Sequence, residues 1–222
     1  MQEIKRETNM TKLIIVRHGF STSNLKKTLT GHLDAPLSEM GQKQGVAVSE
    51  YLFKNYTFDH IYSSDLKRAI QTVAHLSTLS NMPIIKDQGL REICCGVWEG
   101  LPLTQIMQEY TEDYEKWHSY SSDVCPKGGE TFSELQQRAF KALTKIAEEN
   151  QGKTVIVATH GGFIKVVQGN LLGLALERLG EIPYLPNAAI IELEYCDGKF
   201  KIASEVIDSY LDGMKTEMPK GI

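Results

Sequence analysis

Two short apolar runs in this chain each end in a histidine followed by a glycine. Residues 13–16 precede Arg17-His18-Gly19, and residues 154–158 precede Thr159-His160-Gly161. Short, mostly branched apolar runs are typical of strands that are buried on both faces of a parallel sheet. Ligands of open α/β sheets bind beyond the carboxyl ends of the strands. If the two strands are neighbours, both imidazoles are therefore expected to face one crevice.

Strand-like and helix-like segments alternate along most of the chain. The pattern predicts helices over 39–54, 66–79, 102–120, 130–149 and 161–172, further strands at 60–63, 84–85, 188–195 and 200–206, and a long loop after Gly19. Cys196-Asp197-Gly198 is a hairpin-turn signal between the last two strands. This alternation predicts an α/β fold, a three-layer α/β/α sandwich whose mostly parallel central sheet has an antiparallel edge strand. We expect one domain over residues 1–222, with 1–10 and about 211–222 as tails.

Composition and charge argue against some classes of binding partner. The formal net charge is -4 and no basic block stands out, which argues against nucleic acid or an anionic membrane as the main partner. Four cysteines follow neither a zinc-site spacing nor a disulfide framework. No run resembles a signal peptide or is long enough to span a bilayer, so we expect a cytoplasmic protein.

The pair of histidines allows two kinds of chemistry. A metal site is disfavoured because no Asp or Glu stands at helical or hairpin spacing to the pair, and because Arg17 would repel a cation. In phosphoryl transfer one histidine is the nucleophile and fixed positive groups stabilise the phosphoryl oxygens. Arg17 and Arg68 can supply that charge, and Arg68 lies in the first turn of a predicted helix, which also favours an anion.

The residues around these histidines resemble a known family. Arg17-His18-Gly19, followed by Ser21 and Asn24, is similar to the signature of the histidine phosphatase superfamily, the phosphoglycerate mutase-like proteins. The resemblance continues in the family order through Thr30-Gly31, 34–38 (DAPLS), Gly41, 63–72 (SSDLKRAIQT), 90–93 (LREI), Gly96, 98–100 (WEG) and 160–162 (HGG). It covers the chain from Lys12 to about Ile207.

The resemblance implies a role for each matched residue. His18 would attack phosphorus and form a phosphohistidine, Glu92 would act as acid and then base, and Arg17, Arg68 and His160 would clamp the phosphoryl group. Substrate binding would also involve Ser21, Asn24, Thr30, Gly31 and Gly161. The scheme requires no metal and no cofactor.

Some of these side chains have structural alternatives. Glu92 could pair with Arg91, and Asn24, Thr30 and Gly31 could simply shape a turn. A nucleophilic His18 must be neutral, with its other nitrogen bonded to an acceptor such as a loop carbonyl. His160 is better suited to be cationic, as a donor to the phosphate.

The segment after Glu92 separates two reactions of the family. Mutases of the family carry a tyrosine, a lysine and an Asn-Ser pair where this chain has Cys95, Leu103 and Gly162-Phe163, and they carry paired arginines where residues 102–129 contain none. We therefore predict a phosphatase that hydrolyses small phosphomonoesters, with a phosphoglycerate mutase as the alternative. A non-catalytic phospho-ligand-binding protein would be expected to have lost the nucleophile or a clamp residue, and none is lost.

The same segment bears on substrate and partners. Residues 101–127 should select the substrate, and a less polar lining from Leu103, Cys95, Phe163 and Trp98 would suit a partly apolar or broad range; Trp117 could line the pocket mouth or the core. The expected partner is a small phosphorylated metabolite, and the chain could form a homodimer. Cys94 and Cys95 are expected to be packing residues.

Overall fold

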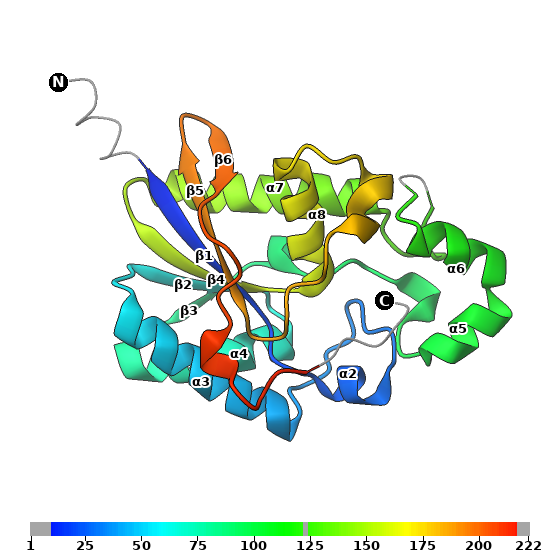
Figure 1. Cartoon of the computed structure of the whole chain (residues 1–222), viewed down its shortest axis with the longest axis horizontal. Helices are drawn as coiled ribbons and strands as arrows, with labels where there is room; N and C mark the ends of the chain where they lie inside the picture. The colour runs from blue at the N-terminus through cyan, green and yellow to red at the C-terminus, as the bar shows by residue number, and fades with distance from the viewer. Residues whose placement is uncertain (1–9, 122–123, 217–222) are drawn as a thin grey trace.

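A mixed sheet runs through the part of the chain that the computed structural model describes, residues 10–121 and 124–216 (Figure 1). Its strands are β1 (Thr11–Arg17), β2 (His60–Ser63), β3 (Ile84–Lys86), β4 (Thr154–Thr159), β5 (Ile190–Cys196) and β6 (Lys199–Ile202). The helices are α2 (Thr22–Lys26), α3 (Glu39–Asn55), α4 (Lys67–Ser80), α5 (Leu103–Glu109), α6 (Thr111–His118), α7 (Phe132–Glu149) and α8 (Gly161–Leu171). Helices α3 and α4 cover one face of the sheet, and α7 and α8 cover the other. The predicted three-layer α/β/α fold is confirmed.

The order of the strands, β3-β2-β4-β1-β5-β6, brings the two His-Gly pairs together. β1 and β4 are parallel neighbours, with Arg17 opposite Thr159. The backbone N–H of His18 donates to Thr159 O at 2.9 Å, so His18 and His160 leave the sheet at the same edge. The predicted antiparallel edge is confirmed and consists of β5, which pairs antiparallel with β1, and β6, which pairs antiparallel with β5.

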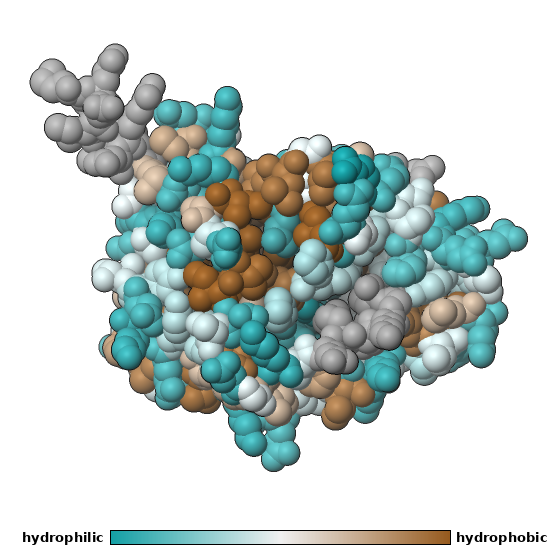
Figure 2. Space-filling view, in the orientation of Figure 1, coloured by the Kyte–Doolittle hydropathy of each residue, from teal (hydrophilic) through white to brown (hydrophobic). Residues whose placement is uncertain are grey.

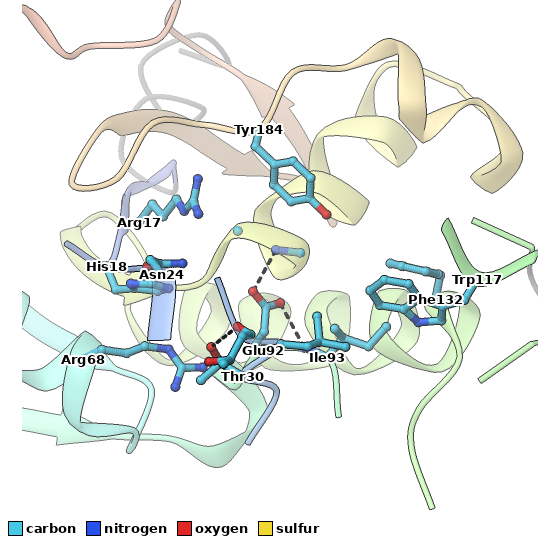
Figure 3. A pocket seen from close by; sticks show the side chains of 14 residues that line it. Arg17, His18, Asn24, Thr30, Arg68, Glu92, Ile93, Trp117, Phe132 and Tyr184 are labelled. Atoms are coloured by element: carbon cyan, nitrogen blue, oxygen red, sulfur yellow. Dashed lines mark hydrogen bonds between the residues drawn. The ribbon is translucent and has the colours of Figure 1, made fainter. Parts of the chain in front are cut away.

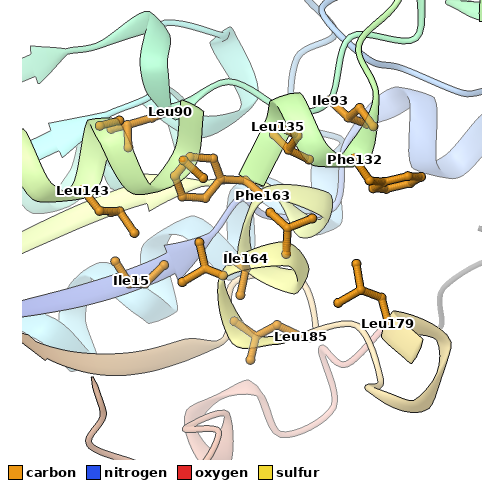
Figure 4. Close-up of a cluster of buried hydrophobic side chains, with 14 of the residues drawn as sticks. Ile15, Leu90, Ile93, Phe132, Leu135, Leu143, Phe163, Ile164, Leu179 and Leu185 are labelled. Atoms are coloured by element: carbon orange, nitrogen blue, oxygen red, sulfur yellow. The ribbon is translucent and has the colours of Figure 1, made fainter. Parts of the chain in front are cut away.

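The apolar run of β1 is explained by burial on both faces. Leu13 and Ile15 pack into the cluster under α7 and α8, part of which is drawn in Figure 4, whereas Ile14 and Val16 pack into the cluster under α3 and α4. Each buried aliphatic side chain of this size stabilises the fold by about 1.5–3 kcal/mol. Because no face of β1 is exposed, its sequence shows no alternation of polar and apolar residues.

Two predicted segments differ from the structure. The loop after Gly19 contains the short helix α2, which begins with a capping box between Ser21 and Asn24. The helix predicted over 102–120 is two helices, because the backbone breaks at Tyr110 (φ -130°, ψ 38°).

The start of α4 is held by a residue of another segment. Asp34 Oδ1 accepts from Lys67 N at 2.7 Å, which ties the loop after α2 to α4.

The predicted C-terminal tail is docked as far as the structure describes it. Leu211 is fully buried, and the side-chain amide of Gln44 donates to Met214 O at 2.7 Å. Residues 1–9 and 217–222, which belong to the predicted tails, lie outside the described residues. Figure 2 shows polar side chains around the rim of the face drawn in Figure 1 and apolar side chains near its middle. No helix in the described ranges is long and apolar enough to cross a bilayer.

Candidate active site

A pocket opens beyond the carboxyl ends of β1 and β4 (Figure 3). Its polar and charged side chains gather at one end, and Trp117 and Phe132 lie at the other, with Glu92 and Tyr184 on opposite sides between them. The residues that line it are Arg17, His18, Asn24, Thr28, Leu29, Thr30, Arg68, Glu92, Ile93, Trp117, Phe132, Gly161, Gly162 and Tyr184. One end is therefore suited to an anion and the other to an apolar group.

His18 is buried at the polar end of the pocket, and its tautomer follows from one contact. Nδ1 lies 2.7 Å from Gly19 O. A carbonyl oxygen only accepts, so Nδ1 carries the proton and Nε2 keeps a lone pair. Burial lowers the pKa of His18 well below its usual 6.5, and the charges of Arg68 and Arg17 act in the same direction. At neutral pH His18 is thus a neutral imidazole, the form that a nucleophile requires.

Arg68, the second residue of α4, has all three of its guanidinium nitrogens bonded. Nη1 donates to Leu33 O and Nη2 to Gly31 O, each at 2.8 Å, and Nε donates to His160 Nδ1 at 3.2 Å. A guanidinium has no acceptor, so His160 Nδ1 must accept. The proton of a neutral His160 ring is then on Nε2, which lies 2.8 Å from Ser64 Oγ.

The expectation that His160 is cationic is wrong for the free protein. Burial lowers its pKa well below 6.5, and Arg68 and His18 lower it further. The rings of His18 and His160 lie 5.2 Å apart between centroids. His160 is therefore a neutral ring that is bonded to both Arg68 and Ser64.

Arg17 provides a second buried cation. It ends β1, its Nη1 donates to Leu185 O, and its Cζ lies 5.8 Å from the centroid of the Tyr184 ring. Burial lowers the pKa of Arg17 and of Arg68 to about 10, although the charge of Glu92 acts the other way. Both guanidinium groups stay protonated at neutral pH. Two cations near a single carboxylate favour a bound anion.

Glu92 is held at the N-terminus of α8. Oε1 accepts from Ile93 N at 3.0 Å and from Phe163 N at 3.2 Å, and Oε2 accepts from Gly162 N at 3.0 Å. A Cβ on Gly162 would lie 2.5 Å from Glu92 Oε1, so only glycine permits this approach. Free N–H groups at a helix start hold a carboxylate well. Arg91, the alternative partner of Glu92, instead forms a bidentate pair with Asp65 at 2.6 and 2.7 Å.

Sequence reasoning missed the residue that supports the Glu92 loop. Arg138 of α7 donates to the carbonyl oxygens of Gly89, Arg91 and Glu92 at 2.9–3.0 Å. Its guanidinium also pairs with Glu130 at 2.6 and 2.8 Å. The available signal was a charged residue on the apolar face of an amphipathic helix, next to the buried position 139.

The predicted substrate-binding residues fall into two groups. Asn24, Thr30 and Gly161 line the pocket, as do four of the five predicted catalytic residues, Arg17, His18, Arg68 and Glu92. The fifth, His160, does not line the pocket and is bonded to Arg68. Ser21 and Gly31 do not line it. Ser21 caps α2 through Asn24 N, and Gly31 O accepts from Arg68.

Apart from Trp117, the apolar lining comes from residues other than those expected. Leu103, Cys95, Phe163 and Trp98 are buried in the core and do not line the pocket, which corrects the prediction. The lining is instead supplied by Leu29, Ile93, Trp117, Phe132 and Tyr184. Trp117 and Tyr184 belong to segments far apart in the sequence, and Tyr184 was not predicted.

The cysteines and acidic residues form no further site in the described ranges. Cys94, Cys95, Cys125 and Cys196 are all free thiols. Burial raises the pKa of Cys95 well above its usual value, which agrees with a packing role. Among residues 10–121 and 124–216, no three His, Cys, Asp or Glu side chains are grouped so that they could hold a metal ion.

Comparison with known proteins is consistent with this geometry. The model of the histidine phosphatase superfamily (branch 1) matches residues 13–208. A metal-independent phosphoserine phosphatase of Arabidopsis thaliana is 32% identical over 213 residues, which covers 95% of this chain and 85% of the relative. Phosphoglycerate mutase-like protein 4 of the same plant is 34% identical over 161 residues, covering 72% and 70%. The solved structure of Bacillus stearothermophilus YhfR superposes with a TM-score of 0.86 at 29% identity, covering 90% of this chain and 99% of YhfR.

Proposed function

This chain belongs to the histidine phosphatase superfamily (branch 1) and is a phosphatase, and we propose that it hydrolyses small phosphomonoesters through a phosphohistidine on His18. The observation that carries the proposal is the state of His18. Its Nδ1 is bonded to Gly19 O, which leaves the Nε2 lone pair available between two buried guanidinium groups.

The first half of the reaction transfers the phosphoryl group to the protein. The phosphate oxygens are bound by Arg17 and Arg68, and His160, whose Nδ1 accepts from Arg68 Nε at 3.2 Å, orients the Arg68 guanidinium. His18 Nε2 attacks phosphorus while the ester P–O bond breaks, and Glu92, which takes up a proton from solvent when the anionic substrate binds, gives that proton to the leaving oxygen. Preorganised donors of this kind contribute about 3–4 kcal/mol each to such a transition state.

The second half returns the site to its starting state. A water molecule gives its proton to Glu92 and attacks phosphorus, and the P–N bond breaks. Inorganic phosphate and a neutral His18 result, and Glu92 is protonated again. The three backbone N–H groups that hold Glu92 keep the same carboxyl group in place for both proton transfers.

The far end of the pocket supports hydrolysis over intramolecular transfer. Trp117, Phe132, Tyr184, Ile93 and Leu29 offer no charged ligand there, within the described residues. A mutase must hold the dephosphorylated intermediate while it reorients, whereas an apolar chamber lets an uncharged alcohol leave and water enter. We therefore propose that the preferred leaving groups are apolar or aromatic alcohols.

The test is a panel of phosphate-release assays. We expect kcat/KM for 1-naphthyl phosphate and p-nitrophenyl phosphate to exceed that for phosphoserine and 3-phosphoglycerate, and His18→Asn to abolish release. Activity should persist in EDTA. Conversion of 3-phosphoglycerate to 2-phosphoglycerate faster than phosphate release would overturn the assignment in favour of a mutase.

Two finer points belong to the same proposal. Four free thiols support a reducing compartment such as the cytoplasm, where we place the protein. The partner is a small phosphorylated metabolite, and assembly into a homodimer can be checked by light scattering on the purified protein.

A further inference from the structure

A buried lysine lies behind the wall of the pocket and takes no part in the proposed reaction. Lys165 is in α8, its side chain is 4% exposed, and its Nζ donates to Ile182 O at 2.7 Å. Nζ also lies 3.9 Å from the centroid of the Tyr184 ring and 5.1 Å from that of Tyr120. A buried ammonium group is costly unless its protons find partners, and the faces of two tyrosine rings are partners of the cation–π kind.

The two rings come from segments that are otherwise separate. Tyr120 follows α6, where it has a left-handed backbone (φ 57°), and Tyr184 lies in the loop between α8 and β5. The side chains of Tyr120 and Tyr184 interact with each other. Burial raises the pKa of Tyr184 well above 10 and lowers that of Lys165 to about 8, with Arg17 also lowering the latter. Near pH 7 the cluster is thus a cation between two neutral rings.

The contacts of Lys165 with Tyr120 and Tyr184 extend to the apolar half of the pocket. Tyr184 lines the pocket directly. The ring of Tyr120 packs edge-on against Phe132 with centroids 4.9 Å apart, and Phe132 lies 5.4 Å from Trp117. Lys165 therefore contacts Tyr184 directly, is connected to Phe132 through Tyr120, and is connected to Trp117 through Tyr120 and Phe132.

We propose that Lys165 is a positioning residue, whose ammonium group fixes Tyr184 and Tyr120 and so shapes the part of the pocket that receives the leaving group. The inference rests on the proposed function, because it concerns how that site recognises the alcohol half of a phosphomonoester. Lys165 acts through the tyrosines and does not touch the phosphoryl group.

The experiment separates the two ends of the pocket. Lys165→Gln keeps a donor for Ile182 O but removes the cation, and Lys165→Arg keeps the cation. The KM for 1-naphthyl phosphate reports both ends of the pocket, whereas the competitive inhibition constant of inorganic phosphate reports only the phosphoryl end. For the Gln variant we expect KM to rise about tenfold, with kcat and the phosphate inhibition constant within about twofold of the original protein, and for the Arg variant a KM within about threefold.

Three results would overturn the inference. These are an unchanged KM in the Gln variant, an equal rise in the phosphate inhibition constant, and an Arg variant as impaired as the Gln variant. Should the Gln variant fail to fold, Lys165→Met is used. Tyr184→Leu completes a double-mutant cycle, in which the effect of removing the cation should largely disappear once the Tyr184 ring is gone.

The control is the unaltered protein. If it does not hydrolyse 1-naphthyl phosphate, or if His18→Asn retains that activity, the proposed function itself fails. If the unaltered protein is active and depends on His18, an unchanged KM in the Gln variant contradicts only the role of Lys165.

Discussion

The guanidinium of Arg68 donates from Nε to Nδ1 of His160 at 3.2 Å, and this bond determines where the proton of His160 lies. Since Arg68 cannot accept, Nε2 of a neutral His160 must carry the proton, and Ser64 Oγ lies 2.8 Å from it. Arg68 is thus both a phosphate-binding cation in the proposed reaction and the group that orients the ring of His160.

Replacing Arg68 by lysine tests this double role. Lysine lacks the planar fork, so it cannot bond Gly31 O, Leu33 O and His160 at once. We expect kcat/KM to fall by about 100-fold or more, since one preorganised donor contributes that much. The exposed Arg178→Lys is the matched control and should leave kcat/KM unchanged. Nitrogen-15 shifts of His160 should show Nε2 protonated in the original protein, and an Nδ1-protonated ring there would contradict the assigned tautomer.

The two buried histidines predict a specific loss of stability in acid. Their pKa values lie well below 6.5 in the folded protein, whereas the unfolded chain titrates near 6.5. Between those values the unfolded state binds more protons, so the free energy of unfolding falls as pH drops through 6.5, by about 1.4 kcal/mol per pH unit for each histidine.

Urea unfolding between pH 7.5 and 5 measures this slope. His18→Asn and His160→Asn should each reduce it, whereas His118→Asn, at an exposed position of α6, should not. A slope that is the same in all four proteins would show that neither buried histidine is held neutral.

Gly162→Ala should displace Glu92 without disrupting the sheet. The added Cβ would lie 2.5 Å from Glu92 Oε1, so the carboxyl group must move away from the N-terminus of α8. We expect kcat to fall by about 100-fold, the range for loss of a positioned acid–base group. Gly180→Ala is the control, because its Cβ would meet no atom closer than 3.8 Å. Equal activities of the two variants would contradict the placement of Glu92.

Arg138→Met tests the support of the Glu92 loop. The substitution removes the guanidinium donors to Glu130 and to the carbonyl oxygens of Gly89, Arg91 and Glu92. Breaking one partner of a largely buried pair of this kind costs about 3–5 kcal/mol of unfolding free energy. Denaturant unfolding should show a loss in that range, and kcat should fall in the fraction that remains folded. A loss below about 1 kcal/mol would mean that the loop is held by other contacts.

The parts of the site that could be predicted from the sequence are residues at the end of a recognisable strand. Arg17 and His18 adjoin one strand, and His160 adjoins another with the same apolar character, so the parallel sheet brings them together. Arg68 was predicted from its place in the first turn of a helix, and the family resemblance supplied Glu92. A loop carbonyl was expected to fix the tautomer of His18, and in the structure this carbonyl is Gly19 O.

The parts that sequence did not predict depend on contacts between distant segments. Asp34, in the loop after α2, accepts from the first N–H of α4. Arg138 of α7 donates to three carbonyl oxygens, and Tyr184 lines the pocket from the loop before β5. Neither the secondary-structure propensity of a segment nor the periodicity of its apolar residues indicates such contacts. The neutral state of His160 was missed for the same reason, since it follows from burial and from Arg68.

The most direct test of the account is to trap the phosphorylated protein. The protein is mixed with phosphorus-32-labelled p-nitrophenyl phosphate, quenched in alkali within milliseconds and digested, and the labelled peptide is identified by mass spectrometry. We predict an acid-labile, alkali-stable phosphoryl group on His18 that forms with the burst of p-nitrophenol and is absent from His18→Asn. Hydrolysis without a labelled protein, or label on any other residue, would contradict His18 as the nucleophile.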